Sequence, residues 1–160
     1  MVAIASKSEE HYRKTVALLL QLHQLMQDGK SESNEADAIR DQLDIPWKRL
    51  TQNESLRIDN LSADLASIEP ASPFKHPNGG GILSSKIADQ IQSARQANRC
   101  EEILFILREH SEDVSADRAA FLRGWCYEQL GESEVARLFF AFAAHLDRKN
   151  DLYAVFSAPA

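Results

Sequence analysis

Cysteine is scarce in this chain, with Cys100 and Cys126 the only two among 160 residues. They form no CxxC pair, and no histidine stands at a zinc-finger spacing from them, so the sequence has no zinc-binding pattern. The two are able in principle to form a disulfide. In a chain without an export signal, however, the favoured state is two reduced, part-buried thiols.

Long apolar runs are also missing. The first residues, MVAIASKSEEHYRK, contain no apolar stretch of secretory-signal length. The longest strongly apolar stretch, Val16 to Leu22, has seven residues, too few to cross a bilayer core of about 30 Å. We therefore expect a cytoplasmic protein that does not insert into a membrane.

Positive charge is in short supply as well. The chain has 24 acidic and 18 basic residues, a formal net charge of −6, and neither half is basic. Because phosphate binding relies on clustered lysine and arginine, this balance argues against nucleic acid or an anionic lipid surface as the main partner. The hydrophobic share of 44% is sufficient for a packed core. We expect one compact domain or two very small ones.

Strand patterns are nearly absent, and helical periodicity takes up most of the chain, which predicts an all-α protein. Ser6 with Glu9, and Thr51 with Glu54, have the spacing of a helix capping box, and Gly29 supplies a left-handed helix stop. The predicted helices cover residues 8–28, 34–43, 51–68, 84–97, 99–110, 116–130 and 133–146. Residues 151–156 fit either a helical turn or a short extended piece.

Two N-terminal helices carry apolar stripes that predict their buried sides. Pro46, between the predicted second and third helices, is expected to begin a short turn. The predicted third helix has its stripe at Ile58, Leu61, Leu65 and Ile68. The predicted first helix has its stripe at Tyr12, Val16, Leu19, Leu20, His23 and Met26.

The stretch PASPFKHPNGGG, residues 70–81, interrupts the helical pattern with three prolines and three consecutive glycines. It predicts a linker or long loop. It does not match a phosphate-binding loop, because the Gly-Lys-Ser/Thr ending and a preceding strand are both missing. We therefore expect an N-terminal helical segment over 1–69, this loop, and a C-terminal set of antiparallel helix pairs over 82–160.

The sequence offers no recognisable catalytic or metal-binding arrangement, so we expect no enzyme activity, no metal and no cofactor. His110 and His145 each stand near a predicted helix end, where positive charge is favoured. A ribonuclease of the paired-helix type uses an arginine followed four to six residues later by a histidine. Arg108 precedes His110 by two residues and Arg137 precedes His145 by eight, so neither pair fits.

Small and aromatic residues recur in a regular order in the C-terminal half, at Gly124, Tyr127, Gly131, Ala136, Phe140 and Ala143. This pattern resembles a tetratricopeptide repeat over residues 117–150, one repeat length. A small residue in each helix lets two antiparallel helices approach closely, and Gly131 turns the chain between them. Ala120, Arg123 and Arg148 depart from the pattern, and the preceding stretch, 84–116, matches only as apolar helix pairs.

The residues Arg118, Phe121, Trp125 and Glu128 are spaced three, four and three apart, so they share one face of a helix. In tetratricopeptide repeats this face of the first helix lines the groove that takes peptides. The resemblance therefore implies that these four residues bind a partner, and a tryptophan beside charged residues suits a binding hot spot. The alternative is that Phe121 and Trp125 are buried against the preceding helix pair.

A second resemblance lies in the N-terminal half. The stretch EADAIRDQLDIPWKRLTQNESLRIDNLSADLASIE is similar to a segment of bacterial helical proteins that have no assigned activity. The likeness implies architecture and not chemistry. The matching residues are Ala36, Asp37, Arg40, Asp41, Trp47, Leu50, Glu54, Leu61, Ser62, Asp64 and Leu65.

These observations favour a non-enzymatic protein–protein interaction module, a helical scaffold that binds a peptide segment or a partner helix on the Phe121/Trp125 face. The acidic balance favours a partner segment that carries lysine or arginine. The alternatives are a small acidic chaperone for a secreted or regulatory partner, a nuclease acting on RNA, and a homodimeric scaffold.

Overall fold

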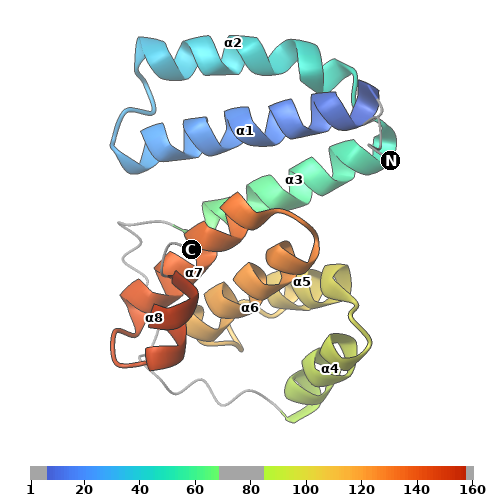
Figure 1. The fold of residues 1–160 in the computed structure, drawn as a ribbon, viewed down its shortest axis with the longest axis vertical. Helices are drawn as coiled ribbons and strands as arrows, with labels where there is room; N and C mark the ends of the chain where they lie inside the picture. Colours follow the sequence, from blue (N-terminus) through green and yellow to red (C-terminus); the bar gives the residue numbers. More distant parts are fainter. Residues whose placement is uncertain (1–6, 69–84, 158–160) are drawn as a thin grey trace. The chain divides into compact units, whose positions relative to one another are not determined.

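The structure, a computed structural model, describes residues 7–68 and 85–157 (Figure 1). Within these ranges every regular element is a helix and there is no strand, so the predicted all-α class is confirmed. None of the helices in the described ranges combines the length and the apolar character needed to cross a membrane. The helices are α1 (Lys7–Gln27), α2 (Asn34–Lys48), α3 (Gln52–Ala66), α4 (Ser85–Gln96), α5 (Cys100–Glu109), α6 (Ala116–Gln129), α7 (Ser133–Leu146) and α8 (Asp151–Ser157).

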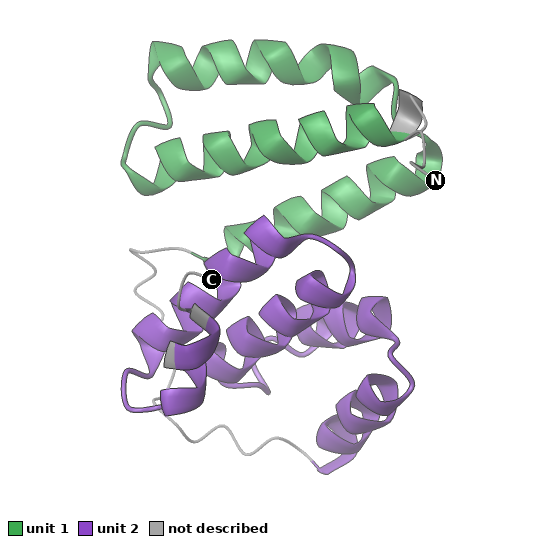
Figure 2. Ribbon diagram, viewed as in Figure 1, with its two compact units in different colours: residues 1–71 green, residues 72–160 purple. Residues whose placement is uncertain are grey.

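Contacts along the chain divide it into two compact units, residues 1–71 and residues 72–160 (Figure 2). The first unit contains α1 to α3 and the second contains α4 to α8. The division falls in the stretch for which the sequence predicts a linker, residues 70–81, and this stretch lies outside the described residues. Each unit has buried side chains of its own.

In the first unit, α1 packs against both α2 and α3 (Figure 1). The stripe predicted for α1 is only partly right, because Tyr12 and Val16 are buried whereas Met26 is 55% exposed. Thr15 and Leu18, which are not on that stripe, are buried as well. A helix with neighbours on two sides buries more of its circumference than a single stripe. For α3 the prediction is confirmed, with all of its stripe buried: Ile58, Leu61, Leu65 and Ile68.

The predicted turn at Pro46 is wrong, because α2 continues through this proline to Lys48. Proline has no N–H group to donate to the carbonyl of Gln42, four residues earlier. Gln42 is exposed, so water can satisfy that carbonyl. Pro46 itself is buried, and the loss of one hydrogen bond near the end of the helix is offset by this packing.

The local signals that mark helix ends are confirmed where the structure describes them. The backbone N–H of Glu54 donates to Oγ1 of Thr51 at 3.2 Å, and the N–H of Thr51 donates to Oε2 of Glu54 at 2.8 Å. The predicted capping box is therefore complete. Gly29 has φ 73 and follows the end of α1, as its left-handed stop requires. The other predicted capping residue, Ser6, lies outside the described residues.

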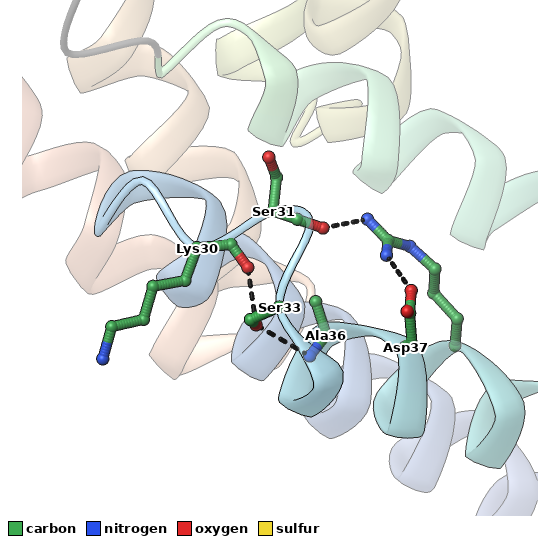
Figure 3. Close-up of polar contacts among 6 residues, drawn as sticks. Lys30, Ser31, Ser33, Ala36 and Asp37 are labelled. Carbon is green, nitrogen blue, oxygen red and sulfur yellow. Dashed lines mark hydrogen bonds and ion pairs between the residues drawn. The ribbon is translucent and has the colours of Figure 1, made fainter.

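The connection between α1 and α2 is held by side-chain contacts at the start of α2 (Figure 3). Oγ of Ser33 accepts a hydrogen bond from the N–H of Ala36 at 3.2 Å and so caps the helix. The guanidinium of Arg40 donates to Asp37 at 2.8 Å and to the carbonyl of Ser31 at 2.7 Å. Ala36, Asp37 and Arg40 are among the residues for which the sequence predicts a likeness to bacterial helical proteins, and here they have a structural role.

In the second unit, each helix packs against the next one in the chain, from α4 to α8. The stretch that the sequence left undecided, 151–156, forms the helix α8. Asn98, between α4 and α5, has φ 55, a left-handed conformation in which asparagine is enriched. The largest buried side chains of this unit include Ile103, Leu107, Val135 and Phe139.

Candidate functional site

The α6–α7 pair carries the residues from which the sequence predicts a likeness to a tetratricopeptide repeat, and its two helices approach each other closely. At Gly124 of α6, a Cβ atom would lie 2.7 Å from two ring carbons of Phe140 in α7. Ala136 and Ala143, the small residues of α7 in the pattern, are fully buried. Gly131 has φ 84 after the end of α6, a conformation that glycine adopts without steric cost. The close packing of α6 and α7 therefore requires a residue without a side chain at position 124.

Phe121, on the predicted binding face, belongs to an aromatic cluster of α6, α7 and α8. Its ring centroid lies 5.6 Å from that of Phe140, 5.2 Å from Tyr153 and 5.3 Å from Phe156. These distances are typical of stabilising aromatic pairs. Phe121 is half-buried, and these three aromatic rings belong to the helices that follow it in the chain.

Trp125, one turn further along α6, contacts a different helix. The guanidinium carbon of Arg95, in α4, lies 5.2 Å from the centroid of a Trp125 ring, which is within reach of a cation–π interaction. Trp125 is half-buried and Arg95 is exposed. A solvated charged side chain therefore covers the indole. Sequence reasoning missed Arg95, because no periodic signal links residues on two different helices.

Arg118 and Glu128 lie at the two ends of the predicted face, and both are exposed. The four predicted residues are on one helix, but their surroundings differ. Phe121 packs in the aromatic cluster, Trp125 lies under Arg95, and the two charged residues face solvent. Partner binding by these residues stays a prediction.

A polar contact attaches α8 to α6 beside the aromatic cluster. The hydroxyl of Tyr153 donates a hydrogen bond of 3.1 Å to Oδ2 of Asp117, in the first turn of α6. Tyr153 is only 5% exposed. Burial, and then the negative charge of Asp117, raise the pKa of Tyr153 to about 12. The phenol therefore stays neutral, and remains a hydrogen-bond donor, at physiological pH.

Cys100 and Cys126 are not joined by a disulfide, and they are 4% and 0% exposed. Burial raises the pKa of the Cys100 thiol, whereas its hydrogen bond with Cys126 lowers it. Because the thiolate is the reactive form, Cys100 is suited to packing and not to nucleophilic chemistry.

The histidines of the described residues occupy helix ends or partly buried positions. His110 is the C-cap residue of α5, and its Nδ1 lies 3.4 Å from Oδ2 of Asp113. His145 is exposed in the last turn of α7, and burial lowers the pKa of His23 in α1. Within residues 7–68 and 85–157, no group of three His, Cys, Asp or Glu side chains is placed to hold a metal ion.

The likeness to a tetratricopeptide repeat, expected from the sequence around Gly124 and Gly131, stays a prediction. So does the N-terminal likeness, whose Asp37 and Arg40 contact each other at the start of α2. Comparison of the chain with models of known protein families, with curated proteins and with solved structures finds no match in any of the three.

Proposed function

We propose that the unit of residues 72–160 is a non-enzymatic protein-binding module that holds an extended segment or a helix of a partner against α6. The observation that carries this proposal is the half-buried Trp125 ring, covered by the exposed guanidinium of Arg95 at 5.2 Å. Tryptophan and arginine are residues on which binding energy concentrates at protein interfaces. Because Arg95 is solvated, a partner can share or displace it without disturbing the buried core.

The charged ends of the face give the bound segment a length and a direction. Ten positions separate Arg118 from Glu128, which corresponds to about 15 Å along a helix. An extended segment of about five residues covers that length. Opposite charges at the two ends favour a segment with its acidic group near Arg118 and its basic group near Glu128.

Phe121 contributes to this proposal as a preformed boundary of the face. Its contacts with Phe140, Tyr153 and Phe156 are made without a partner. A surface whose side chains are already ordered loses less conformational entropy on binding. The exposed part of the half-buried Phe121 ring is therefore available for contact at little additional cost.

Affinity capture from a lysate of the native host, followed by mass spectrometry, tests the proposal. We would compare wild type with Trp125→Ala and with Trp47→Ala, a matched tryptophan variant in the first unit, after circular dichroism shows that all three are folded. The expected result is a partner captured by wild type and by Trp47→Ala but lost by Trp125→Ala. A partner retained by folded Trp125→Ala, or no reproducible partner, would contradict the proposal.

Three further measurements separate the alternatives, all of which we place in the cytoplasm. A captured partner that is degraded or aggregates without this protein would favour the chaperone. Self-association in sedimentation without any other partner would favour the homodimeric scaffold. RNA cleavage by wild type that is lost in His110→Ala would replace the proposal with a nuclease.

A further inference from the structure

The helix α5 exposes a large aromatic side chain on the side that faces away from the core. Phe105 is 57% exposed. The side of α5 that faces the core is formed by its neighbours in the chain, which are all buried: Ile103, Leu104, Ile106 and Leu107. A single exposed apolar residue is ordinary on a protein surface, so its surroundings decide whether it has a role.

Phe105 borders a hollow between α4 and α5, which we call the α4–α5 hollow. The hollow has a volume of about 500 Å³, and its lining residues are Gln90, Glu102, Phe105, Ile106, Glu109 and His110. A volume of this size accommodates one or two side chains of a partner. The ring of Phe105 and the side chain of Ile106 supply its apolar surface.

Acidic side chains surround Phe105 on the exposed side of α5. Glu101 and Glu102 precede it by about one helical turn, Glu109 follows it by one turn, and all three are exposed. Glu102 is paired with Arg99 at 2.7 Å, and Arg108 is half-buried with contacts of its own. Glu112 and Asp113, just after α5, are also exposed. Five carboxylates against the two guanidinium groups of Arg99 and Arg108 leave the side of α5 that carries Phe105 with a net negative charge.

We infer that the α4–α5 hollow binds a cationic amphipathic helix of a partner protein, with one large apolar side chain against Phe105 and Ile106. One lysine or arginine of this helix pairs with Glu109, and a second pairs with Glu102 beside or in place of the exposed Arg99. The charge complementarity identifies the occupant, because a neutral or acidic helix would leave these carboxylates facing an unfavourable surface. Apolar residues at helical spacing, laid into a groove, are an established mode of peptide recognition.

The spacing of the carboxylates matches the repeat of such a helix. Glu102 and Glu109 are seven positions apart on α5, which is two helical turns, or about 10.5 Å. A partner helix that lies along α5 therefore presents basic residues seven positions apart, with its apolar residue midway between them. This surface lies on α5 and not on α6, so the inference goes beyond the proposed function and holds or fails separately from it.

A synthetic peptide of about 14 residues, long enough for partial helix formation, tests the inference on the full-length protein. The peptide carries a central leucine and lysines three and four positions to each side. Two controls are a peptide of the same composition in scrambled order and a peptide with glutamate in place of lysine. We expect the first peptide alone to bind in isothermal titration calorimetry, with an affinity that falls as salt concentration rises.

Two pairs of variants locate the binding. Phe105→Ala is expected to weaken the affinity at least tenfold, whereas Leu56→Ala, at a residue of similar exposure (58%) in α3, leaves it unchanged. Glu109→Lys is expected to weaken binding and to reduce its salt dependence, whereas Glu134→Lys, at an exposed site on α7, does neither. Circular dichroism establishes that each variant is folded.

The inference is overturned if the first peptide does not bind, if the scrambled peptide binds equally well, or if Phe105→Ala binds with unchanged affinity. Trp125→Ala keeps full affinity for this peptide if the two surfaces are separate. A result in which Phe105→Ala binds normally and Trp125→Ala does not would assign the cationic segment to the α6 face instead. The two proposals are thereby distinguished within one set of measurements.

Discussion

Replacing Gly124 with alanine tests how closely α6 and α7 pack. In an open helix this substitution stabilises by about 1 kcal/mol, because glycine is a poor helix former. Here the new Cβ would lie 2.7 Å from Cδ1 and Cε1 of Phe140, far inside the usual carbon–carbon contact of about 3.5–4.0 Å. Phe140 is 4% exposed, and its ring is 5.6 Å from Phe121 and 5.1 Å from Phe156. The Phe140 ring therefore has little room to move away from the new methyl group.

The two effects have opposite signs, and the steric one is larger. Inserting a methyl group into a well-packed core costs about 1–3 kcal/mol, against the gain of about 1 kcal/mol in helix propensity. We therefore expect Gly124→Ala to destabilise the second unit by about 1 kcal/mol. Urea unfolding in a Trp47→Phe background measures this value, because Trp125 is then the only tryptophan and reports on its own unit.

Two further variants isolate the cause. Ala141→Gly, at an exposed position of α7, measures the helix propensity of glycine in this protein and should cost about 1 kcal/mol. Combining Gly124→Ala with Phe140→Leu should recover part of the loss, since the shorter side chain leaves room for the methyl group. If Gly124→Ala instead stabilises the unit by as much as Ala141→Gly destabilises it, the close approach of α6 and α7 is refuted.

Three other outcomes are expected from single residues. Thr51→Ala removes the side-chain cap of α3 and should cost about 1 kcal/mol, measured by Trp47 fluorescence during urea unfolding in a Trp125→Phe background; no change would mean that the cap is not formed. The pKa of Tyr153 is raised to about 12 by burial and Asp117. The contribution of this tyrosine to the free energy of unfolding is therefore fully present below about pH 10 and is lost as the pH rises toward 12. Urea unfolding between about pH 9 and pH 11 should show this decline in wild type but not in Tyr153→Phe. Because Cys100 and Cys126 are buried, both thiols should react slowly with a disulfide reagent in native protein and quickly in urea; fast native reaction would contradict their burial.

Features of the fold that depend on neighbours in the chain were predictable from the sequence. The capping box at Thr51 needs only two residues three positions apart, and the stop at Gly29 needs only one. The bounds of α7, Ser133–Leu146, are those predicted. Pro46 was not predictable in the same way, because its place inside α2 depends on burial, a property of the folded unit. The seven-residue α8 was too short for periodicity to identify.

The candidate site shows the same limit more clearly. Helical spacing places Phe121 and Trp125 on one face of α6, but it does not reveal which residues of other helices contact them. Arg95 reaches Trp125 from α4, and Tyr153 reaches Phe121 from α8. Phe105, by contrast, had a usable signal, since helical spacing places it on the side of its helix that carries Glu101, Glu102 and Glu109.

The division into two units has a consequence for the lifetime of the protein in a cell. Each unit is small, and small domains bury a lower fraction of their surface and are only marginally stable. The units 1–71 and 72–160 each bury side chains of their own, so a substitution in the core of one acts first on the stability of that unit. Proteases act on whichever segment unfolds first, and the weaker unit therefore sets the turnover of the whole chain. A substitution at Ile58 or Leu61 that makes the first unit the weaker one would thus also lower the cellular amount of the α5 and α6 surfaces, although these lie in the second unit.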